Sequence, residues 1–413
     1  MEISKLILED RENKNRYIQK YVIDYQVITL KANIPGICKQ TKEAYLLLNY
    51  FDKILFDKGL TKSLVLDGAD GPMYIYLTSK DNSLKKEMIK VEELPLGRFV
   101  DIDVFNGLIS DNRPKLRKCY ICDNPAAVCG RINKHTVQEL NEYISNSIIT
   151  ELSEIIRKLC NESIMEELNM HPKFGLVTPY TSGSHRDMNY NTMIAAKDAI
   201  MDSFVEMFIL AYKSDDIRFI FEQSRNIGQK AEQLMNYATN NINAYKGLIF
   251  ALGLFITSIG YKLSHLNQDI DIFKIISEMT EGITNELKVG NETFGKIAYQ
   301  KYGITGARGE AEKGFPHVNY VVKNFKINDE LDKYKVLFYL ISNIDDTVFL
   351  KKSETYEHYL SIKKLFNNDS ITYELINFID EKLSDENLSF GGSADLLIVC
   401  IFLKKLNCIF NII

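Results

Sequence analysis

From residue 136 onward, apolar residues recur at intervals of three and four positions, and this spacing restricts most of the chain to a helical fold. Leu140, Ile144, Ile148 and Leu152 begin the pattern. Residues spaced in this way lie on one side of an α-helix. The same reasoning predicts helices at about 193–211, 217–237, 246–264, 270–288, 329–342, 357–366 and 395–406. We therefore expect an all-α domain in the second part of the chain.

The first third of the chain has a different pattern, in which extended and helical segments alternate. Runs of β-branched and aromatic residues predict strands. The expected strands are 21–30, 73–77 and 99–105, and the expected helices are 4–21 and 41–58. A chain of 413 residues exceeds the roughly 250–300 residues at which one core stops growing. We therefore expect two domains, an α+β domain at 1–145 and an all-α helical domain at 146–413, joined directly by a long helix.

Charge and hydropathy exclude two broad classes of function. The net charge of −5 provides no general attraction for nucleic acid or an anionic membrane. The most apolar run, Gly247–Tyr261, is flanked by Lys246 and Lys262 and is shorter than the ~20 residues that cross a bilayer, so a buried core helix is expected. The N-terminus carries charges where a signal peptide has an apolar segment, which predicts a cytoplasmic protein.

A first candidate site lies in the segment Gly97–Val104. Alternate side chains of a strand share a face, so Asp101 and Asp103 would point the same way and hold Mg²⁺ bound to a polyphosphate. Nearby cations that would neutralise phosphate oxygens are Lys39, Arg98, Arg113, Lys115, Arg117 and Arg131. The alternative is an edge strand whose acidic face is solvated.

Three cysteines and a histidine follow this strand. Cys119, Cys122, Cys129 and His135 have the donor types of a zinc site, and the first spacing fits one. Their later spacings match no common zinc module. The alternative is a set of reduced cysteines that pack a compact, turn-rich segment.

A second candidate site lies in Gly306–Pro316, which combines glycines, an arginine and carboxylates in what we expect to be one turn-rich segment. Glycines allow close approach of a ligand to the backbone, and Arg308 would bind phosphate. Glu310 and Glu312 would accept a proton or hold a metal ion. Two separate sites of this chemistry suggest a two-step enzyme.

Other glycine-bearing segments of the second half carry similar chemistry. The turn Gly183–Asn189 contains His185 and Asp187, although Ser184 there could instead cap a helix, with Asp187 completing a capping box. Glycines at the start of a helix expose backbone N–H groups to phosphate. Such starts are expected at Lys246-Gly247 and at Gly391-Gly392-Ser393.

The motifs of the first domain resemble those of the apo-citrate lyase phosphoribosyl-dephospho-coenzyme A transferase family. They are Asn33-Ile34-Pro35-Gly36 with Lys39, the run Gly97–Val104, and Arg117–Cys122 followed by Cys129, Arg131 and His135. The resemblance implies transfer of a phosphoribosyl-dephospho-coenzyme A unit to a serine of the citrate lyase acyl carrier subunit, with release of pyrophosphate. It also explains the spacing of the cysteines and the histidine without requiring zinc.

The second half resembles the triphosphoribosyl-dephospho-coenzyme A synthase family in its glycine-rich turns, in Gly306–Pro316 and in Gly391–Asp395. The resemblance implies that a ribose hydroxyl of dephospho-coenzyme A attacks C1 of the ATP ribose and that adenine leaves. Asp187 and Glu310 would then stabilise charge or accept the proton. The implied ligands of Mg²⁺ are Asp187, Glu312, Asp345 and Asp346, and the implied phosphate contacts are His185, Lys246 and Arg308.

The chain departs from this family's pattern in two places, which keeps other hypotheses open. Tyr245 stands where relatives carry a histidine, and Val348 and Lys351-Lys352-Ser353 replace an asparagine and an Arg-Gly-Gly run. The helical half would then be a module that binds dephospho-coenzyme A or the carrier protein without synthesis. A third hypothesis is a related system for malonate decarboxylase, which the first-domain motifs oppose.

Overall fold

The computed structural model describes residues 2–80, 84–107, 117–289, 293–368 and 370–413. Contacts between residues divide the chain into two compact units. Unit 1 contains Met1–Glu154, Leu263–Asp269 and Ile409–Ile412, and unit 2 contains Ile155–Lys262, Ile270–Cys408 and Ile413. The helix α5 (Val137–Leu168) runs without interruption past residue 145, as expected for a helix that joins the two parts.

Unit 1 is built on a small antiparallel sheet with the strand order β2-β3-β1-β4. Its strands are β1 (Gln26–Ala32), β2 (Lys62–Leu66), β3 (Met73–Thr78) and β4 (Val100–Phe105). Its helices before α5 are α1 (Glu2–Tyr21), α2 (Lys42–Asp57), α3 (Leu84–Glu92), the short 3-10 helix η1 (Gly97–Phe99) and α4 (Ala126–Arg131). This α+β arrangement confirms the expected character of the first part of the chain.

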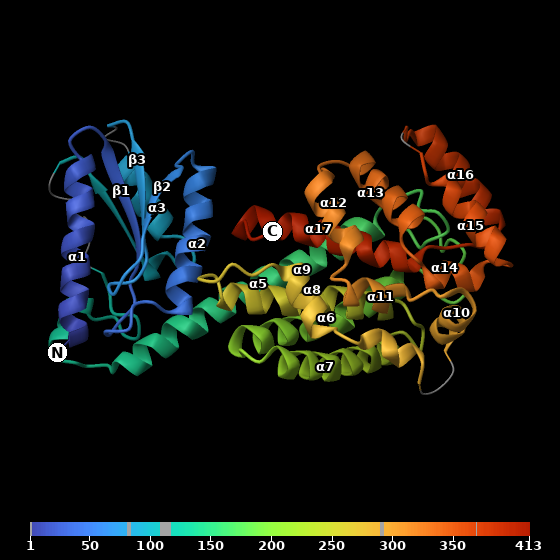
Figure 1. Ribbon diagram of the computed structural model, residues 1–413, viewed down its shortest axis with the longest axis horizontal. Coiled ribbons are helices and arrows are strands. Elements are labelled where there is room, and N and C mark those ends of the chain that lie inside the picture. Colours follow the sequence, from blue (N-terminus) through green and yellow to red (C-terminus); the bar gives the residue numbers. More distant parts are fainter. Residues whose placement is uncertain (1, 81–83, 108–116, 290–292, 369) are drawn as a thin grey trace. The chain divides into compact units, whose positions relative to one another are not determined.

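Helices lie on both faces of the sheet (Figure 1). On one face, Ile18 and Val22 at the end of α1 pack against Val27, Met73 and Ile75. The opposite face is covered by α2, which contacts β1, and by α3, which contacts β4. Thr41 begins α2 by accepting a hydrogen bond from the N–H of Ala44, so the predicted start of this helix is confirmed.

Every regular element that the structure describes in unit 2 is a helix (Figure 1). The elements after α5 are α6 (Tyr190–Lys213), α7 (Ile217–Ala238), α8 (Lys246–Ser264), α9 (Ile272–Met279), η2 (Ile283–Leu287), α10 (Phe294–Tyr302), α11 (Gly306–Glu312), α12 (Pro316–Asn324), α13 (Glu330–Asn343), α14 (Thr347–Lys352), α15 (Tyr356–Leu365), α16 (Tyr373–Asp385) and α17 (Gly391–Phe410). The expected helical character of the second part is therefore confirmed.

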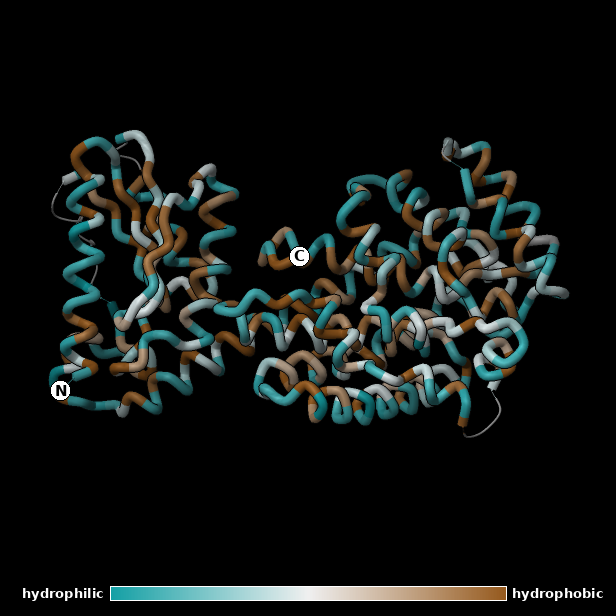
Figure 2. Tube along the Cα trace, viewed as in Figure 1, coloured by the Kyte–Doolittle hydropathy of each residue, from teal (hydrophilic) through white to brown (hydrophobic). Residues whose placement is uncertain are grey.

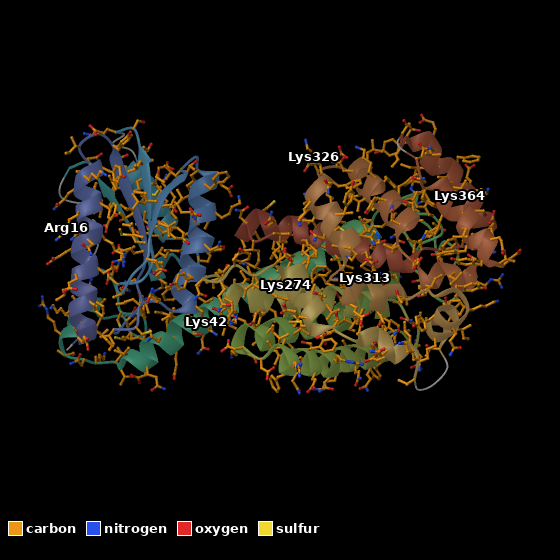
Figure 3. The ribbon with its side chains drawn as sticks, viewed as in Figure 1. Arg16, Lys42, Lys274, Lys313, Lys326 and Lys364 are labelled. Atoms are coloured by element: carbon orange, nitrogen blue, oxygen red, sulfur yellow. The ribbon has the colours of Figure 1, made fainter. Side chains whose placement is uncertain are left out.

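The core of unit 2 surrounds α8 and α17. By length and composition α8 is one helix that could cross a membrane, but 83% of its apolar window is buried inside the protein. That burial agrees with the expectation of a core helix. In contrast, α7 is amphipathic and appears largely teal along its length in Figure 2. Charged side chains such as Lys274, Lys313, Lys326 and Lys364 point outward from separate elements (Figure 3).

Two predictions about local structure were wrong. Gly306–Pro316 is not one turn-rich segment, because α11 occupies Gly306–Glu312 and α12 begins at Pro316. The turn between them is short and places Gly314 and Phe315 at positive φ. The segment 270–288 is not one helix either, since α9 ends at Met279 and Gly282, with φ 77°, starts η2.

Candidate functional sites

The acidic strand β4 of unit 1 has the predicted alternation. Asp101 and Asp103 are half-buried on one face, while Val100, Ile102 and Val104 are buried on the other. Arg117 holds Asp101 in place, since its Nη2 lies 2.7 Å from Asp101 Oδ1. The same guanidinium also lies 3.3 Å from Glu92. Arg117 thus neutralises the acidic strand directly.

The other predicted cations of unit 1 lie in different surroundings. Arg98 donates to the carbonyl oxygen of Cys119 at 2.8 Å and lies over the ring of Tyr120. Lys39 donates to the carbonyl oxygen of Ile34, and Arg131 is exposed at the end of α4. The two remaining predicted cations, Arg113 and Lys115, lie outside the described residues.

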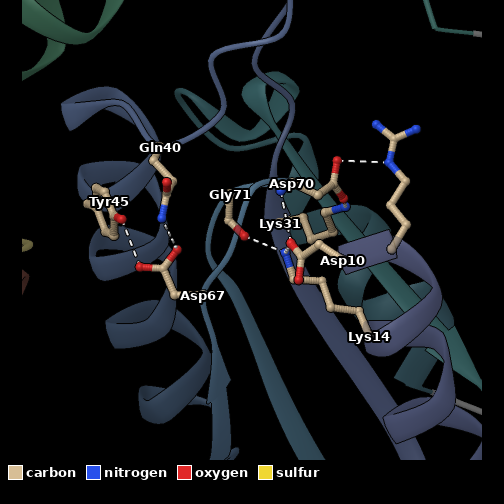
Figure 4. Close-up of polar contacts among 9 residues, drawn as sticks. Asp10, Lys14, Lys31, Gln40, Tyr45, Asp67, Asp70 and Gly71 are labelled. Carbon is tan, nitrogen blue, oxygen red and sulfur yellow. Dashed lines mark hydrogen bonds and ion pairs between the residues drawn. The ribbon is translucent and has the colours of Figure 1, made fainter. Parts of the chain in front are cut away.

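Sequence reasoning missed a group of charges that the fold gathers around the loop between β2 and β3 (Figure 4). The carboxylate of Asp70 is almost fully buried and pairs with Arg11 of α1 at 2.8 Å and with Lys31 of β1 at 2.5 Å. Lys14 pairs with Asp10 at 2.7 Å, and Asp10 accepts from the N–H of Asp70 at 2.9 Å. No single motif contains these residues, so only the folded chain shows them together.

This Asp70 cluster is adjacent to the acidic strand. Lys31 stands directly opposite Asp101 in the β1–β4 pairing, so both side chains lie on the face that α1 covers. Burial lowers the pKa of Lys39. The negative charge of Asp70 opposes this shift, and the positive charges of Arg11 and Lys31 add to it. Asp70 therefore pairs with Arg11 and Lys31 and acts electrostatically on Lys39, while Lys31 also stands opposite Asp101.

Unit 2 contains a cavity of about 230 Å³ where several helices begin. Its lining includes Lys246 and Gly247 at the start of α8, and Gly391 and Gly392 at the start of α17. The two helix starts come close together, because a Cβ on Gly247 would lie 2.1 Å from Oδ2 of Asp395. The first residues of α11 and α14 also line it. The first N–H groups of a helix have no partner within the helix, and some of those at this cavity are already capped, because Asn243 accepts from the N–H of Lys246 and Asp346 from that of Ser393.

The helix α11 separates the two predicted carboxylates of Gly306–Pro316. Glu310 lines the cavity, and its Oε1 lies 2.9 Å from Nδ1 of His317. Its other oxygen is buried and has no hydrogen-bond partner among the residues that the structure describes. Glu312 instead accepts from Thr284 at 2.7 Å and is not part of the described lining. Residues two positions apart lie on different sides of a helix, which explains this separation.

Tyr245, the tyrosine that stands where the resemblance implies a histidine, lies in the cavity wall. It is 2% exposed, and its hydroxyl has no hydrogen-bond partner in the described part of the chain. Burial, together with the charges of Glu167 and Asp395, raises its pKa well above the usual value. Asp395 also lines the cavity, and burial with the nearby carboxylates Glu167 and Asp346 raises its pKa.

Asp346 lines the cavity but serves first as a helix cap. Its Oδ1 accepts from the N–H groups of Val348 and Phe349 at the start of α14. Its Oδ2 accepts from the N–H of Ser393 at 2.9 Å and from the Ser393 hydroxyl at 3.2 Å. Ser393, a predicted phosphate contact, therefore points its hydroxyl at Asp346. Because burial outweighs these bonds, the pKa of Asp346 is raised.

The turn that carries His185 is not built by the predicted Ser184 cap. Asn189 caps α6 and forms a capping box with Thr192, while Ser184 donates to the carbonyl oxygen of Leu388. His185 lines the cavity, and burial, with the charge of Lys352, lowers its pKa to about 4. It is therefore neutral at pH 7. Asp187 is exposed and outside the described lining.

A second cavity, of about 390 Å³, adjoins the first, because Lys246, Gly247 and Ala307 line both. Lys246 pairs with Glu232 at 2.8 Å. Arg308 lies in the second cavity, 3.4 Å from Glu286, which also pairs with Arg225 at 2.6 Å. The two cavities therefore meet near the start of α8.

Comparison with known proteins gives a match for each part of the chain. Residues 153–412 match the family described as ATP:dephospho-CoA triphosphoribosyl transferase. Residues 3–151 match the family described as apo-citrate lyase phosphoribosyl-dephospho-CoA transferase.

Individual relatives agree with this division. "Protein CitXG" of Leuconostoc mesenteroides subsp. cremoris is 29% identical over 97% of this chain and 96% of its own length. "Protein CitXG" of Haemophilus influenzae is 31% identical over 80% of this chain and 78% of its own length. A "2-(5''-triphosphoribosyl)-3'-dephosphocoenzyme-A synthase" of Haemophilus ducreyi is 33% identical over 69% of this chain and 99% of its own length. The chain is therefore a transferase that belongs, through residues 153–412, to the ATP:dephospho-CoA triphosphoribosyl transferase family and carries an apo-citrate lyase phosphoribosyl-dephospho-CoA transferase domain at residues 3–151.

Proposed function

We propose that the protein both makes and attaches the prosthetic group of citrate lyase. Unit 2 joins ATP and 3'-dephospho-coenzyme A to give 2'-(5''-triphosphoribosyl)-3'-dephospho-coenzyme A and adenine. Unit 1 then transfers the phosphoribosyl-dephospho-coenzyme A unit to a serine of the citrate lyase acyl carrier protein and releases diphosphate. The observation that carries the proposal is the cavity of unit 2, which combines helix starts with a buried carboxylate oxygen of Glu310.

The triphosphate of ATP fits the starts of α8 and α17. Both helices are long, and their N-terminal residues line the same cavity. The start of a helix carries a partial positive charge that favours phosphate oxygens, although the N–H of Lys246 already bonds to Asn243 and that of Ser393 to Asp346. Lys246 adds a full charge at the same place. His185, being neutral, contributes a hydrogen bond and not a charge.

Glu310 is the group best placed to act on the attacking hydroxyl. As the ribose hydroxyl of dephospho-coenzyme A bonds to C1 of the ATP ribose, its proton passes to the unpartnered Oε2; the bond from C1 to adenine breaks, and adenine leaves with the bonding electrons and takes up a proton from solvent. His317 holds the carboxylate through Oε1 and so acts as a positioning residue. The Tyr245 hydroxyl, which also lacks a partner in the described residues, is available to a substrate oxygen.

The carboxylates of unit 2 also fit a magnesium ion. Burial, together with the charges of Glu167 and Asp346, raises the pKa of Asp395, and a cation would relieve the repulsion among these three carboxylates. Asp345 and Asp395 line the cavity and would hold Mg²⁺, which neutralises triphosphate charge when bound. Glu312 and Asp187, both predicted as ligands, lie outside the described lining. Asp346 already accepts two hydrogen bonds on each oxygen.

In unit 1 we assign the phosphates to the Asp70 cluster. Arg11, Lys31 and Lys39 would bind the diphosphate that leaves, beside Asp101 and Asp103, which would hold Mg²⁺. Arg117 is bonded to Asp101 and keeps the acidic strand oriented. This assignment replaces the predicted phosphate contact of Arg98, which is bonded to the backbone of Cys119.

The synthase step is tested by measuring adenine released from ATP, Mg²⁺ and dephospho-coenzyme A. Glu310→Gln removes the proton acceptor and is expected to lower kcat by about 10² or more. Glu312→Gln is the matched control, since this residue is on the same helix but bonded to Thr284, and should keep most of the activity. Adenine release that survives Glu310→Gln would contradict the assigned base.

The transfer step is tested with supplied intermediate and apo acyl carrier protein. Asp101→Asn should abolish labelling of the carrier while adenine release stays unchanged. Asp57→Asn, at the exposed end of α2, is the control and should leave both steps intact. Normal transfer by Asp101→Asn would remove this strand from the proposed site.

Tyr245 motivates a second candidate, in which unit 2 binds dephospho-coenzyme A or the carrier protein without synthesis. This candidate predicts no adenine from the purified chain, together with normal transfer from supplied intermediate. Tyr245→His separates the two, because a large gain of adenine release would show an impaired site. A small change would show that tyrosine replaces histidine in a working synthase.

A further inference from the structure

The segment 117–136 of unit 1 has almost no hydrophobic core of its own. Within it, only Cys119 and Cys129 are buried among the described residues, while Ile121, Val128 and Ile132 are 41%, 44% and 63% exposed. A segment of this size without its own core is stabilised by packing on the rest of its unit, as Tyr120 packs on Phe99 and Tyr143, or by a cross-link such as a disulfide or a metal ion. No cysteine is paired in a disulfide in the described chain.

The backbone of the segment brings its sulfur and nitrogen donors together. A short antiparallel bridge between Lys118 and Pro125 closes a turn that carries Cys119 and Cys122. The helix α4 contributes Cys129, and the following turn, closed by the bond from the N–H of Lys134 to the carbonyl oxygen of Cys129, contributes His135. The four donors thus come from three separate pieces of backbone.

The four donor atoms lie within 4.8 Å of one another. The Sγ atoms of Cys122 and Cys129 are 3.5 Å apart, and Nε2 of His135 lies 3.3 Å from Sγ of Cys122. A tetrahedral zinc ion with bonds of about 2.3 Å to sulfur and about 2.0 Å to nitrogen places its ligands roughly 3.5–3.8 Å apart. The donors are therefore spaced as they would be around one zinc ion.

A positively charged side chain lies beside the cluster. Lys134 lies 3.5 Å from Sγ of Cys122 and would offset the single negative charge of three thiolates around Zn²⁺.

We propose that Cys119, Cys122, Cys129 and His135 bind one structural zinc ion. Binding displaces the protons of the thiols and leaves no open coordination position, so the ion would not take part in chemistry. The sequence allowed this hypothesis from the donor types alone, but the spacing matched no common zinc module. In the folded protein the four donor atoms lie together, which the sequence spacing does not show.

The zinc ion would position groups of the transferase site. Arg117 begins the segment and pairs with Asp101, and the carbonyl oxygen of Cys119 accepts from Arg98. Tyr120, between the first two cysteines, donates to the carbonyl oxygen of Asn33 at 3.0 Å. Loss of the ion should therefore displace Arg117 from Asp101. This consequence, unlike the metal site itself, rests on the proposed function.

The test starts with the metal content of the full-length protein, measured by mass spectrometry after gel filtration. We expect about one zinc ion per chain, lost in Cys129→Ser and retained in Cys38→Ser, which changes an exposed cysteine outside the cluster. His135→Cys keeps a donor and should retain the ion. A chain without stoichiometric metal, or one with a Cys122–Cys129 disulfide, would overturn the proposal.

Two further measurements keep the result independent of folding defects in the variants. Cobalt exchanged into the unmodified protein should give intense visible bands and sulfur-to-cobalt charge transfer, and weak bands typical of six oxygen ligands would contradict the site. Removal of zinc by a chelator should then slow transfer from supplied intermediate and leave adenine release unchanged. Failure of transfer in the zinc-loaded protein would count against the proposed function and not against the zinc site.

Discussion

Two buried polar atoms that belong to the cavity lining of unit 2, the Tyr245 hydroxyl and Oε2 of Glu310, have no partner among the described residues, and we expect a substrate to contact them. Tyr245→Phe removes a buried hydroxyl that bonds to no described residue, so it should not lower the free energy of unfolding. If the hydroxyl binds substrate, kcat/KM for adenine release should fall about three- to tenfold, which is the factor that corresponds to the loss of one hydrogen bond. Denaturant unfolding and steady-state kinetics together check this expectation.

Tyr334→Phe is the matched control for this prediction. The Tyr334 hydroxyl donates to the carbonyl oxygen of Pro172 at 2.6 Å, so its loss should destabilise the protein by about 1 kcal/mol without affecting kinetics. If both variants leave kcat/KM unchanged, the Tyr245 hydroxyl does not contact a substrate.

His185 should make the protein sensitive to acid. Burial and Lys352 lower its pKa from 6.5 to about 4, with Asp187 opposing the shift, so the folded state binds the proton less readily than the unfolded state. Its destabilising effect therefore begins as the pH falls below about 6.5 and is complete near pH 4. When the pH falls from 7 to 4.5, the free energy of unfolding should therefore decrease less in His185→Gln than in the unmodified protein.

The control for this pH effect is His358→Gln, which changes a histidine paired with Glu386 at 2.8 Å on the surface of unit 2. That variant should keep the full acid sensitivity. Identical pH profiles for His185→Gln and the unmodified protein would mean that His185 titrates normally in the folded state.

At the scale of elements, Asp346 connects the starts of two helices. Asp346→Ala leaves four donors without their acceptor, two on α14 and two from Ser393 on α17, so we expect a loss of about 2 to 4 kcal/mol. Asp345→Ala, at the neighbouring half-exposed position, should stay within about 0.5 kcal/mol of the unmodified protein. Urea unfolding measures both, and equal stability of the two variants would contradict the cap.

Periodicity and capping signals predicted the long elements. The predicted helix 246–264 matches α8, and 217–237 matches α7 within one residue, because each carries a continuous pattern between clear end signals. The short helices α10, α11, α12, α14 and α16 were missed, since six to thirteen residues contain too few periods to stand out. The strand β2 was also missed, as its alternation is weak and it lies at the edge of the sheet.

The sites were predictable only where one motif contains all the functional groups. Asp101 and Asp103 follow from strand alternation, whereas Glu310 and Glu312 were placed together because α11 was not recognised. The Asp70 cluster brings Arg11 of α1 and Lys31 of β1 to one loop, which requires knowledge of the fold. Tyr245 and Asp395 meet in the same way, through the close approach of α8 and α17.

At the scale of the whole molecule, each unit has a core of its own and its own set of candidate catalytic groups. The core of unit 1 lies between its sheet and its helices, and that of unit 2 surrounds α8 and α17. A substitution within one site should therefore leave the other unit folded and active. Covalent linkage of the units does not by itself require direct passage of the intermediate between them.

Mixing two inactivated proteins tests whether the intermediate is released into solution. Glu310→Gln should lack synthesis and keep transfer, and Asp101→Asn should lack transfer and keep synthesis. If the intermediate diffuses freely, an equimolar mixture given ATP, Mg²⁺ and dephospho-coenzyme A will modify the acyl carrier protein after a lag. The Glu310→Gln, Asp101→Asn double variant is the control and should show no modification. We expect the mixture to modify the carrier protein, because the two proposed sites share no described residue. If the mixture stays inactive while each single step is intact, the intermediate must instead pass directly between the two sites of one chain.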